Sequence, residues 1–291
     1  MIHPAFLLFE GITYLLFIAC LIHAARRGLP FVGELVGGLL FGLLLEVVNV
    51  RMGAYHYGRF LVMLGEIPLG VGVGWAVIIY TAMATSDRLG LTPWTRPPAD
   101  ALLALNIDLA MDAIAIRLGE GMWVWYWQDP ALRWTGGWFG VPLGNFYGWL
   151  YVVLLYSTFV RLLRHAGKRQ GWGSWWGVIY PLLAVLLSEP SLYGVLRLSA
   201  ELTYGRGLPD WPFLAVPLGL ALGAVLGWGR PRPTGRPTGW VVPAVPLVFH
   251  LFFLGTMAVF PLAGWTPWLV AVSLAMLGIG LWVHLGVGRR A

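Results

Sequence analysis

Four acidic residues stand in stretches of the chain that are otherwise apolar: Glu46, Asp108, Asp112 and Glu189. A charged side chain in the middle of a bilayer costs about 2.5–3.5 kcal/mol on insertion scales, so such residues usually face the interior of a helix bundle and mark a functional site. Asp108 and Asp112 have i, i+4 spacing, which places both carboxyl groups on one face of a helix. Because two desolvated carboxyl groups that close together do not both ionise, one should keep a proton and serve as a general acid.

The alternative is that these acids only hold helices together, through ion pairs with Arg117 or Arg197 or through hydrogen bonds to backbone groups. This alternative applies most to Glu189. Two further acids, Glu10 and Glu34, lie in apolar stretches away from the group, and we expect them to be structural or to line a path for water.

The apolar stretches that carry these acids are long enough to cross a membrane. Hydrophobic residues make up 58% of the 291 residues and charged residues only 11%, against about 25% charged in soluble domains. This composition excludes a soluble globular domain, a disordered chain and a disulfide-stapled secreted module. A membrane-spanning helix needs about 20 mostly apolar residues. The sequence therefore predicts an all-α, polytopic membrane helix bundle forming a single transmembrane domain over residues 1–291. The nine expected spans are residues 4–25, 31–50, 67–86, 99–118, 144–165, 175–200, 211–228, 240–262 and 265–287.

Basic residues set the expected orientation, because cytoplasmic loops are enriched in Lys and Arg. With the loop that holds Arg26 and Arg27 in the cytoplasm, every later cytoplasmic segment also carries basic residues, including Lys168 and the C-terminal pair Arg289 and Arg290. We therefore expect the N-terminus outside and the C-terminus inside, in the cytoplasmic (inner) membrane of a prokaryote. The net charge of +6 is spread over short clusters, which argues against a nucleic-acid partner. The first residues show neither a basic n-region nor a cleavage site, so no cleaved signal peptide is expected.

A motif of the form [IV]-P-L-G recurs at even spacing, in residues 67–70, 141–144 and 216–219. Each copy opens a predicted span at its outer end, where proline is tolerated in the first helical turn. Each is preceded by a span with an acid in its outer half, so spans two to seven are predicted to form three parallel helical hairpins whose acids surround one cavity. The alternative is a chance recurrence of Pro and Gly, which are frequent in membrane helices. The expected repeat units are residues 31–86, 99–165 and 175–228.

Other kinds of site have no signature in the sequence. The single cysteine, Cys20, excludes an internal disulfide and a cysteine-based metal site, and the six His residues show no metal-ligand spacing. No HExxH, GxGxxG, Walker A or GxSxG motif occurs. We therefore expect no metal and no cofactor, which leaves acid–base chemistry on an apolar substrate, or transport.

Aromatic residues are concentrated in the expected outer loops, among them Tyr55, Tyr57, Trp123 and Trp125. One interpretation is the aromatic belt found at membrane interfaces. The other is the lining of a cavity for an apolar ligand. His56, between the two tyrosines, is expected at the interface, with substrate contact as the alternative.

Between Leu45 and Trp149 the sequence resembles a family of integral-membrane carotenoid biosynthesis proteins, which includes carotenoid 1′,2′-hydratases and the bisanhydrobacterioruberin hydratases of archaea. The resemblance rests on five blocks of sequence, of which the last is the most specific. The blocks are Glu46 followed by Gly53-x-Tyr55-x-Tyr57, Ile67-Pro68-Leu69 with Trp75, Asp108-x-x-x-Asp112, Trp123-x-Trp125, and Gly140-Val141-Pro142-Leu143-x-Asn145-Phe146-x-Gly148-Trp149. The chain departs from the family pattern at Ala113, where proline is expected.

The resemblance implies cofactor-free addition of water to the terminal 1′,2′ double bond of an acyclic carotenoid ψ-end, of the γ-carotene or lycopene type. In this interpretation Asp108 and Asp112 supply the acid and Glu46 is their partner or orients water. Asn145 holds water or a carboxyl group, and Glu189 belongs to the same catalytic set. The expected partners are the carotenoid, membrane lipid and water as co-substrate, with other carotenoid enzymes as candidate neighbours. The residues expected to bind substrate are Tyr55, Tyr57, Trp123, Trp125, Pro142, Phe146 and Trp149.

Three competing functions stay open at this point. A carotenoid end-ring cyclase also protonates an alkene to a tertiary cation, but it excludes water and loses a proton. A proton-coupled transporter would use intramembrane acids and repeated hairpins. A structural or assembly protein would use the acids only to join helices.

Overall fold

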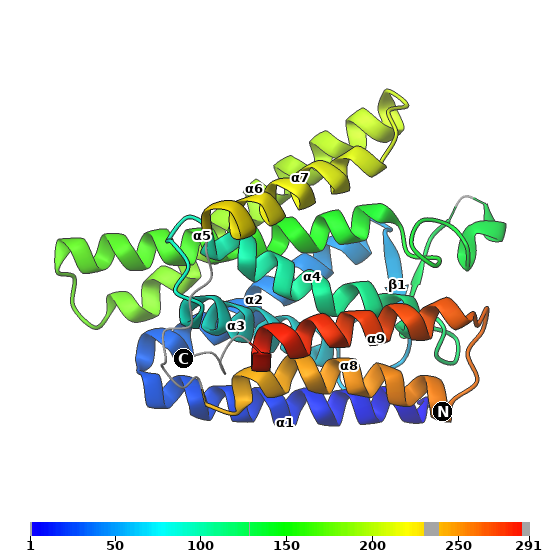
Figure 1. Cartoon of the computed structure of the whole chain (residues 1–291), viewed down its shortest axis with the longest axis horizontal. Coiled ribbons are helices and arrows are strands. Elements are labelled where there is room, and N and C mark those ends of the chain that lie inside the picture. The colour runs from blue at the N-terminus through cyan, green and yellow to red at the C-terminus, as the bar shows by residue number, and fades with distance from the viewer. Residues whose placement is uncertain (1, 128, 230–238, 287–291) are drawn as a thin grey trace.

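The computed structural model of the chain describes residues 2–127, 129–229 and 239–286, and within these ranges it is a bundle of nine long α-helices (Figure 1). Each helix coincides with one predicted span, which confirms the all-α, polytopic bundle. Arg289 and Arg290, which contributed to the predicted orientation, lie outside the described residues. The helices are α1 (Pro4–Arg27), α2 (Leu29–Arg51), α3 (Leu69–Arg88), α4 (Arg96–Ala115), α5 (Leu143–Gln170), α6 (Trp176–Ala200), α7 (Trp211–Gly223), α8 (Val241–Val259) and α9 (Pro267–Leu281).

Proline fixes where several helices begin. Pro4, Pro30, Pro97 and Pro267 each lie in the first turn of a helix, where the missing N–H would have no partner in any case. For this reason α4 begins before residue 99, the first residue of the predicted span.

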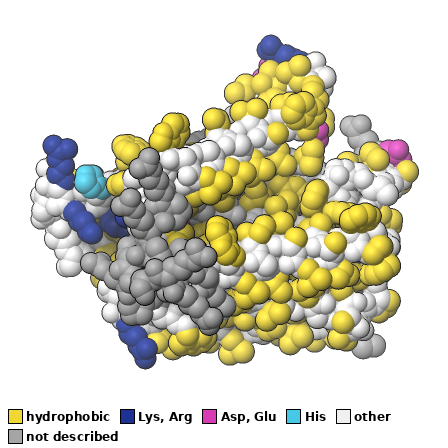
Figure 2. All heavy atoms as spheres, viewed as in Figure 1, with side chains coloured by type: hydrophobic (Ala, Val, Ile, Leu, Met, Phe, Trp, Pro, Cys, Tyr) yellow, Lys and Arg dark blue, Asp and Glu magenta, His cyan; other side chains and the backbone are white. Residues whose placement is uncertain are grey.

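Eight of the described helices are long and apolar enough to cross a membrane, counting the π-helical turns that continue α6 to Gly205, α7 to Gly229 and α9 to His284, so the chain is a multi-pass membrane protein. The remaining helix, α4, carries Asp100, Asp108 and Asp112, and most of its residues are buried. It packs against α3, α5, α7, α8 and α9, so its acids face other helices rather than lipid. Figure 2 shows one face of the outer surface, where hydrophobic side chains cover the flank of the bundle and Lys and Arg gather at its left end and at the projecting tip at the top.

Short strands join two loops at one end of the bundle. Strand β1 (Tyr55–Tyr57), after α2, pairs antiparallel with β4 (Trp123–Trp125), after α4. Strands β2 (Met63–Leu64) and β3 (Ile67–Pro68), which follow β1 in the chain, form a second antiparallel pair. We call this end of the bundle, where α1, α3 and α5 begin, the strand end; the sequence predicts that it lies outside the cell.

Two of the three predicted hairpins are closely packed, since α2 packs along α3 and α4 along α5. The third unit differs, because α7 packs against α5 and α4 and has only sparse contact with α6. The connection between α6 and α7 projects away from the bundle, at the top of Figure 1. The prediction that each [IV]-P-L-G copy opens a span is wrong for the third copy, because Pro217 lies inside α7, which begins at Trp211. The repeat itself stays a prediction.

Ion pairs tie the helices together at the opposite end of the bundle. Arg161 of α5 binds Asp87 of α3 at 2.6 Å and Asp100 of α4 at 2.9 Å. Arg164, one turn later, binds Glu34 of α2 at 2.6 Å. Glu34 also accepts a hydrogen bond from Tyr180 of α6, so these contacts connect five helices and give Glu34 a structural position.

Candidate active site

A cavity of about 800 Å³ lies at the strand end, enclosed by α2, α3, α4, α5 and α6 together with strands β1 and β4. Its walls are mainly apolar and aromatic. Several residues around it are exposed, including Met52 at 72% and Tyr204 at 86%. The cavity therefore opens to the outside of the protein between the ends of α2 and α6 and the beginning of α5.

Glu46 lies on α2 in the wall of this cavity and is only 3% exposed. Its Oε2 accepts hydrogen bonds from the hydroxyl of Tyr55 and, at 2.5 Å, from that of Tyr57. Its Oε1 accepts a hydrogen bond of 2.8 Å from the indole nitrogen of Trp75 on α3. Burial, together with the charge of Glu46, raises the pKa of both tyrosine hydroxyls well above the usual value, so they remain donors at neutral pH.

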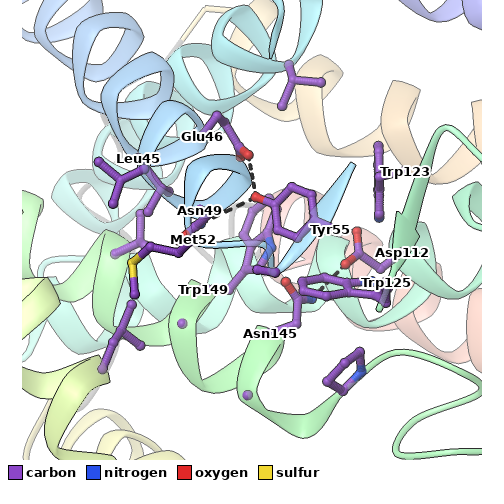
Figure 3. Close-up of a pocket in the computed structure, with 18 of the residues that line it drawn as sticks. Leu45, Glu46, Asn49, Met52, Tyr55, Asp112, Trp123, Trp125, Asn145 and Trp149 are labelled. Carbon is purple, nitrogen blue, oxygen red and sulfur yellow. Dashed lines mark hydrogen bonds between the residues drawn. The ribbon is translucent and has the colours of Figure 1, made fainter. Parts of the chain in front are cut away.

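The pairing of β1 with β4 explains how these tyrosines reach Glu46. The register aligns Tyr55 with Trp125 and Tyr57 with Trp123, so the two loops form one aromatic wall. The rings of Tyr55 and Trp125 lie edge to face with centroids 4.6 Å apart. Figure 3 shows Glu46 pointing toward Tyr55 on one side of the cavity, with Trp123 and Trp125 on the other.

Asp108 and Asp112 meet a single amide on the neighbouring helix. The side-chain nitrogen of Asn145, on α5, donates to Oδ2 of Asp112 at 2.6 Å and to Oδ2 of Asp108 at 2.9 Å (Figure 3 shows the first contact). Both aspartates are buried, and Oδ1 of Asp108 has no hydrogen-bond partner among the described residues. The arrangement brings two carboxyl groups together, and no arginine or lysine of the described residues forms an ion pair with either of them.

A pair of stacked indoles completes the wall. The rings of Trp75 and Trp149 are stacked, with centroids 3.9 Å apart and planes 28° apart, and both residues line the cavity. Trp149 lies on α5, one turn after Asn145, so one helix presents both the amide and the indole. Gly148 and Gly144 on the same helix also line the cavity, and a Cβ added at either would meet open space.

The structure places most of the residues predicted for substrate binding in the cavity wall. Glu46, Asp112 and Asn145 line it as well, and Asp108 lies directly behind Asn145. Phe146 does not line the cavity; it is fully buried in the core, because it points away from the face of α5 that carries Asn145 and Trp149. The predicted substrate residues in the wall are Tyr55, Tyr57, Trp123, Trp125, Pro142 and Trp149.

Glu189 and His56 lie outside the cavity lining. Glu189 is half-buried on α6, and neither carboxyl oxygen has a hydrogen-bond partner among the described residues. His56 is exposed on β1 and packs against Tyr126, because alternate residues of a strand point to opposite faces.

Sequence reasoning missed several residues of the wall. Asn49 donates to the hydroxyl of Tyr55 at 3.3 Å and lines the cavity. Its position one helical turn after Glu46 was a signal that could have found it. Tyr193 of α6 and Phe249 of α8 also line the cavity, but they belong to helices whose neighbours in space the sequence does not specify.

The arginines proposed as partners of the acids do not pair with them. Arg117 donates to the backbone carbonyls of Ala113 and Phe139, both at 2.7 Å, and of Trp134 at 2.9 Å. Burial lowers its pKa to about 10, so it stays charged at neutral pH while it ties the loop after α4 together. Arg197 is exposed on α6 and forms no ion pair with the acids of the cavity in the described part of the chain.

The fold and site together define a multi-pass membrane protein with an apolar, aromatic cavity that presents buried carboxyl groups. The carotenoid biosynthesis protein family matches residues 3–207, which hold all of α1 to α6, and the chain belongs to this family. Comparison with curated proteins and with solved structures found no match for the chain.

Proposed function

We propose that the protein is a cofactor-independent hydratase that adds water to the terminal 1′,2′ double bond of an acyclic carotenoid ψ-end, of the γ-carotene or lycopene type. The observation that carries the proposal is the meeting of Asp108 and Asp112 at the amide of Asn145, in the wall of an apolar cavity that also holds Glu46. Family membership supplies the class of substrate. We place the enzyme in the cytoplasmic membrane of a prokaryote.

The first step is proton transfer from the aspartate pair. Two buried carboxyl groups that share one donor and no cation hold one proton between them, because ionising both would leave two charges without compensation. The O–H bond of the protonated carboxyl breaks, and its proton forms a new C–H bond at C2′. The π electrons of the alkene form that bond, so positive charge develops at C1′, which is tertiary.

The second step is capture of the cation by water. The water oxygen forms a bond to C1′ and gives up one proton, for which the carboxylate of Glu46 is a second acceptor in the wall. Return of a proton to the aspartate pair restores the enzyme, so that alkene and water yield a tertiary alcohol. The indole N–H of Trp125 is buried without a partner among the described residues and is a suitable donor to water or to the new hydroxyl.

The opening of the cavity suits a long, lipid-soluble substrate. The ψ-end would lie against the aromatic wall while the polyene leaves between α5 and α6 past Gly144 and Gly148, which leave room on α5. A through-path for a transported solute is harder to support, because Arg161 and Arg164 join α2, α3, α4 and α5 at the opposite end.

The experiment is expression of the chain in a host that makes γ-carotene or lycopene, followed by mass analysis of the pigments. Hydration adds the mass of one water at the end group, whereas the cyclase alternative gives an isomer of unchanged mass. Asp108→Asn and Asp112→Asn should each abolish the hydroxylated product. Asp100→Asn is the matched control: it is a buried aspartate on the same helix, but it binds Arg161 far from the cavity.

Full activity in both cavity variants would refute the assignment of the acid. An isomeric product from the unaltered chain would show that the reaction is cyclisation rather than hydration, with the same residues acting as the acid.

A further inference from the structure

The ionisable residues of the cavity wall are mostly acidic. Glu46 and Asp112 line it and Asp108 lies behind it, whereas Arg197 is the sole basic residue among the described residues of the lining. Arg197 is exposed on α6, near the opening. The interior of the cavity is therefore acidic and apolar together, a combination that favours a positive charge on an otherwise apolar molecule.

The stacked indoles add a second, independent preference for positive charge. The face of an indole attracts cations more strongly than that of any other aromatic side chain. Here Trp75 donates its N–H to Glu46 at 2.8 Å and stacks on Trp149. A hydrogen bond from the indole N–H to a carboxylate increases the electron density of the ring, so Glu46 strengthens the attraction of the stacked pair for a cation.

We propose that this cavity is a binding site for lipophilic ammonium compounds, with the quaternary nitrogen against the Trp75–Trp149 stack and the apolar chain in the opening toward α6. The inference deepens the proposed function, because a tertiary carbocation and a quaternary ammonium each carry one positive charge on a centre surrounded by apolar substituents, although the first is planar and the second tetrahedral. The Trp75–Trp149 pair, rather than the strand residues Trp123 and Trp125, is the surface that stabilises the cation. In this arrangement Trp149 touches the reacting carbon. Glu46 stabilises the cation indirectly, through its hydrogen bond to Trp75.

The test is calorimetric binding to the purified full chain in detergent, with two probes. One is a geranyl chain bearing a trimethylammonium group, and the other is the neutral isostere in which carbon replaces the nitrogen. The ammonium should bind about tenfold or more tightly than the isostere, since a desolvated cation–π contact and a nearby carboxylate both act on it alone.

Variants separate charge recognition from simple packing. Trp149→Leu should bring the affinities of the two probes together while binding of the isostere persists, and Trp149→Phe should keep part of the difference. Glu46→Gln should also reduce it. Trp172→Leu, which alters an exposed indole at the opposite end of α5, should leave both affinities unchanged.

Equal affinity of the unaltered chain for both probes would overturn the inference even if a hydrated pigment forms. An ammonium preference that depends on Trp149, in a chain that makes no hydrated product, would support the inference and reject hydration. The two results are independent, because binding is measured without turnover.

Discussion

The side-chain amide of Asn145 donates to Oδ2 of Asp112 at 2.6 Å, across the contact between α5 and α4. The same nitrogen donates to Asp108 at 2.9 Å, so one residue holds both carboxyl groups in place. An amide can satisfy two acids without adding charge, whereas a lysine or arginine at this position would fix both as carboxylates and remove the proton.

The first prediction concerns Asn145 itself. Asn145→Leu removes the shared donor at similar volume, so the carboxyl groups lose their fixed separation and product formation should fall by about 100-fold or more, the range for loss of a general acid. Pigment analysis in the producing host measures this, with the amount of membrane-inserted protein determined in parallel. Asn106→Leu is the control, because Asn106 lies on α4 but contacts Met276 and His250. A fully active Asn145→Leu would show that the amide has no part in catalysis.

The second prediction concerns the open side of α5. A Cβ at Gly148 meets nothing within 4 Å, so Gly148→Leu should fold but place a side chain in the cavity that Gly148 lines. We expect the variant to keep its thermal stability and to lose conversion of the long carotene. Gly194→Leu on α6 is the matched control, since Gly194 also has open space within 4 Å but does not line the cavity. Equal activity of both variants would place the substrate elsewhere.

The third prediction concerns Glu10, which holds the segment after β1. Its carboxylate accepts backbone hydrogen bonds from Leu61 at 2.5 Å and Val62 at 3.1 Å. Glu10→Ala leaves these N–H groups without a partner, so the free energy of unfolding should fall by about 1–3 kcal/mol. The segment continues from Tyr57, and activity should fall with it. Denaturation in mild detergent measures stability; an unchanged midpoint would show that other contacts hold the segment.

The positions of the helices could be predicted from the sequence because each membrane-spanning helix must be apolar over the thickness of the bilayer, whatever its neighbours are. Each span needs about 20 apolar residues whatever it packs against, so the eight helices that are apolar enough to cross a membrane follow from hydropathy. The prediction also included α4, although three aspartates make this helix less apolar. The i, i+4 spacing likewise put Asp108 and Asp112 on one face before any contact was known. The partner Asn145 was found through its motif.

Contacts between segments that are far apart in the sequence were harder to predict. Nothing local in the chain indicates that Trp75 donates to Glu46 or that Arg161 binds Asp87 and Asp100, because these pairs depend on how helices are arranged around α4. The even spacing of the repeat placed Glu189 with the other acids, but α7 packs on α5 rather than closely on α6, and Glu189 stays outside the cavity lining. Phe146 shows the same limit, since it directly follows Asn145 on α5 but points into the core rather than into the cavity.

The last prediction concerns the ion pairs at the opposite end of the bundle. Arg161 is largely buried and binds Asp87 and Asp100, so Arg161→Met leaves Asp100 buried without its partner and should cost about 3–5 kcal/mol of stability. Because these residues lie away from the cavity, the protein that remains folded should give the same product at the same rate per molecule. The measurement is a thermal melt paired with product formation normalised to folded protein. A changed product, with unchanged stability, would mean that the opposite end takes part in the reaction and that the site extends along α4 from Asp112 to Asp100.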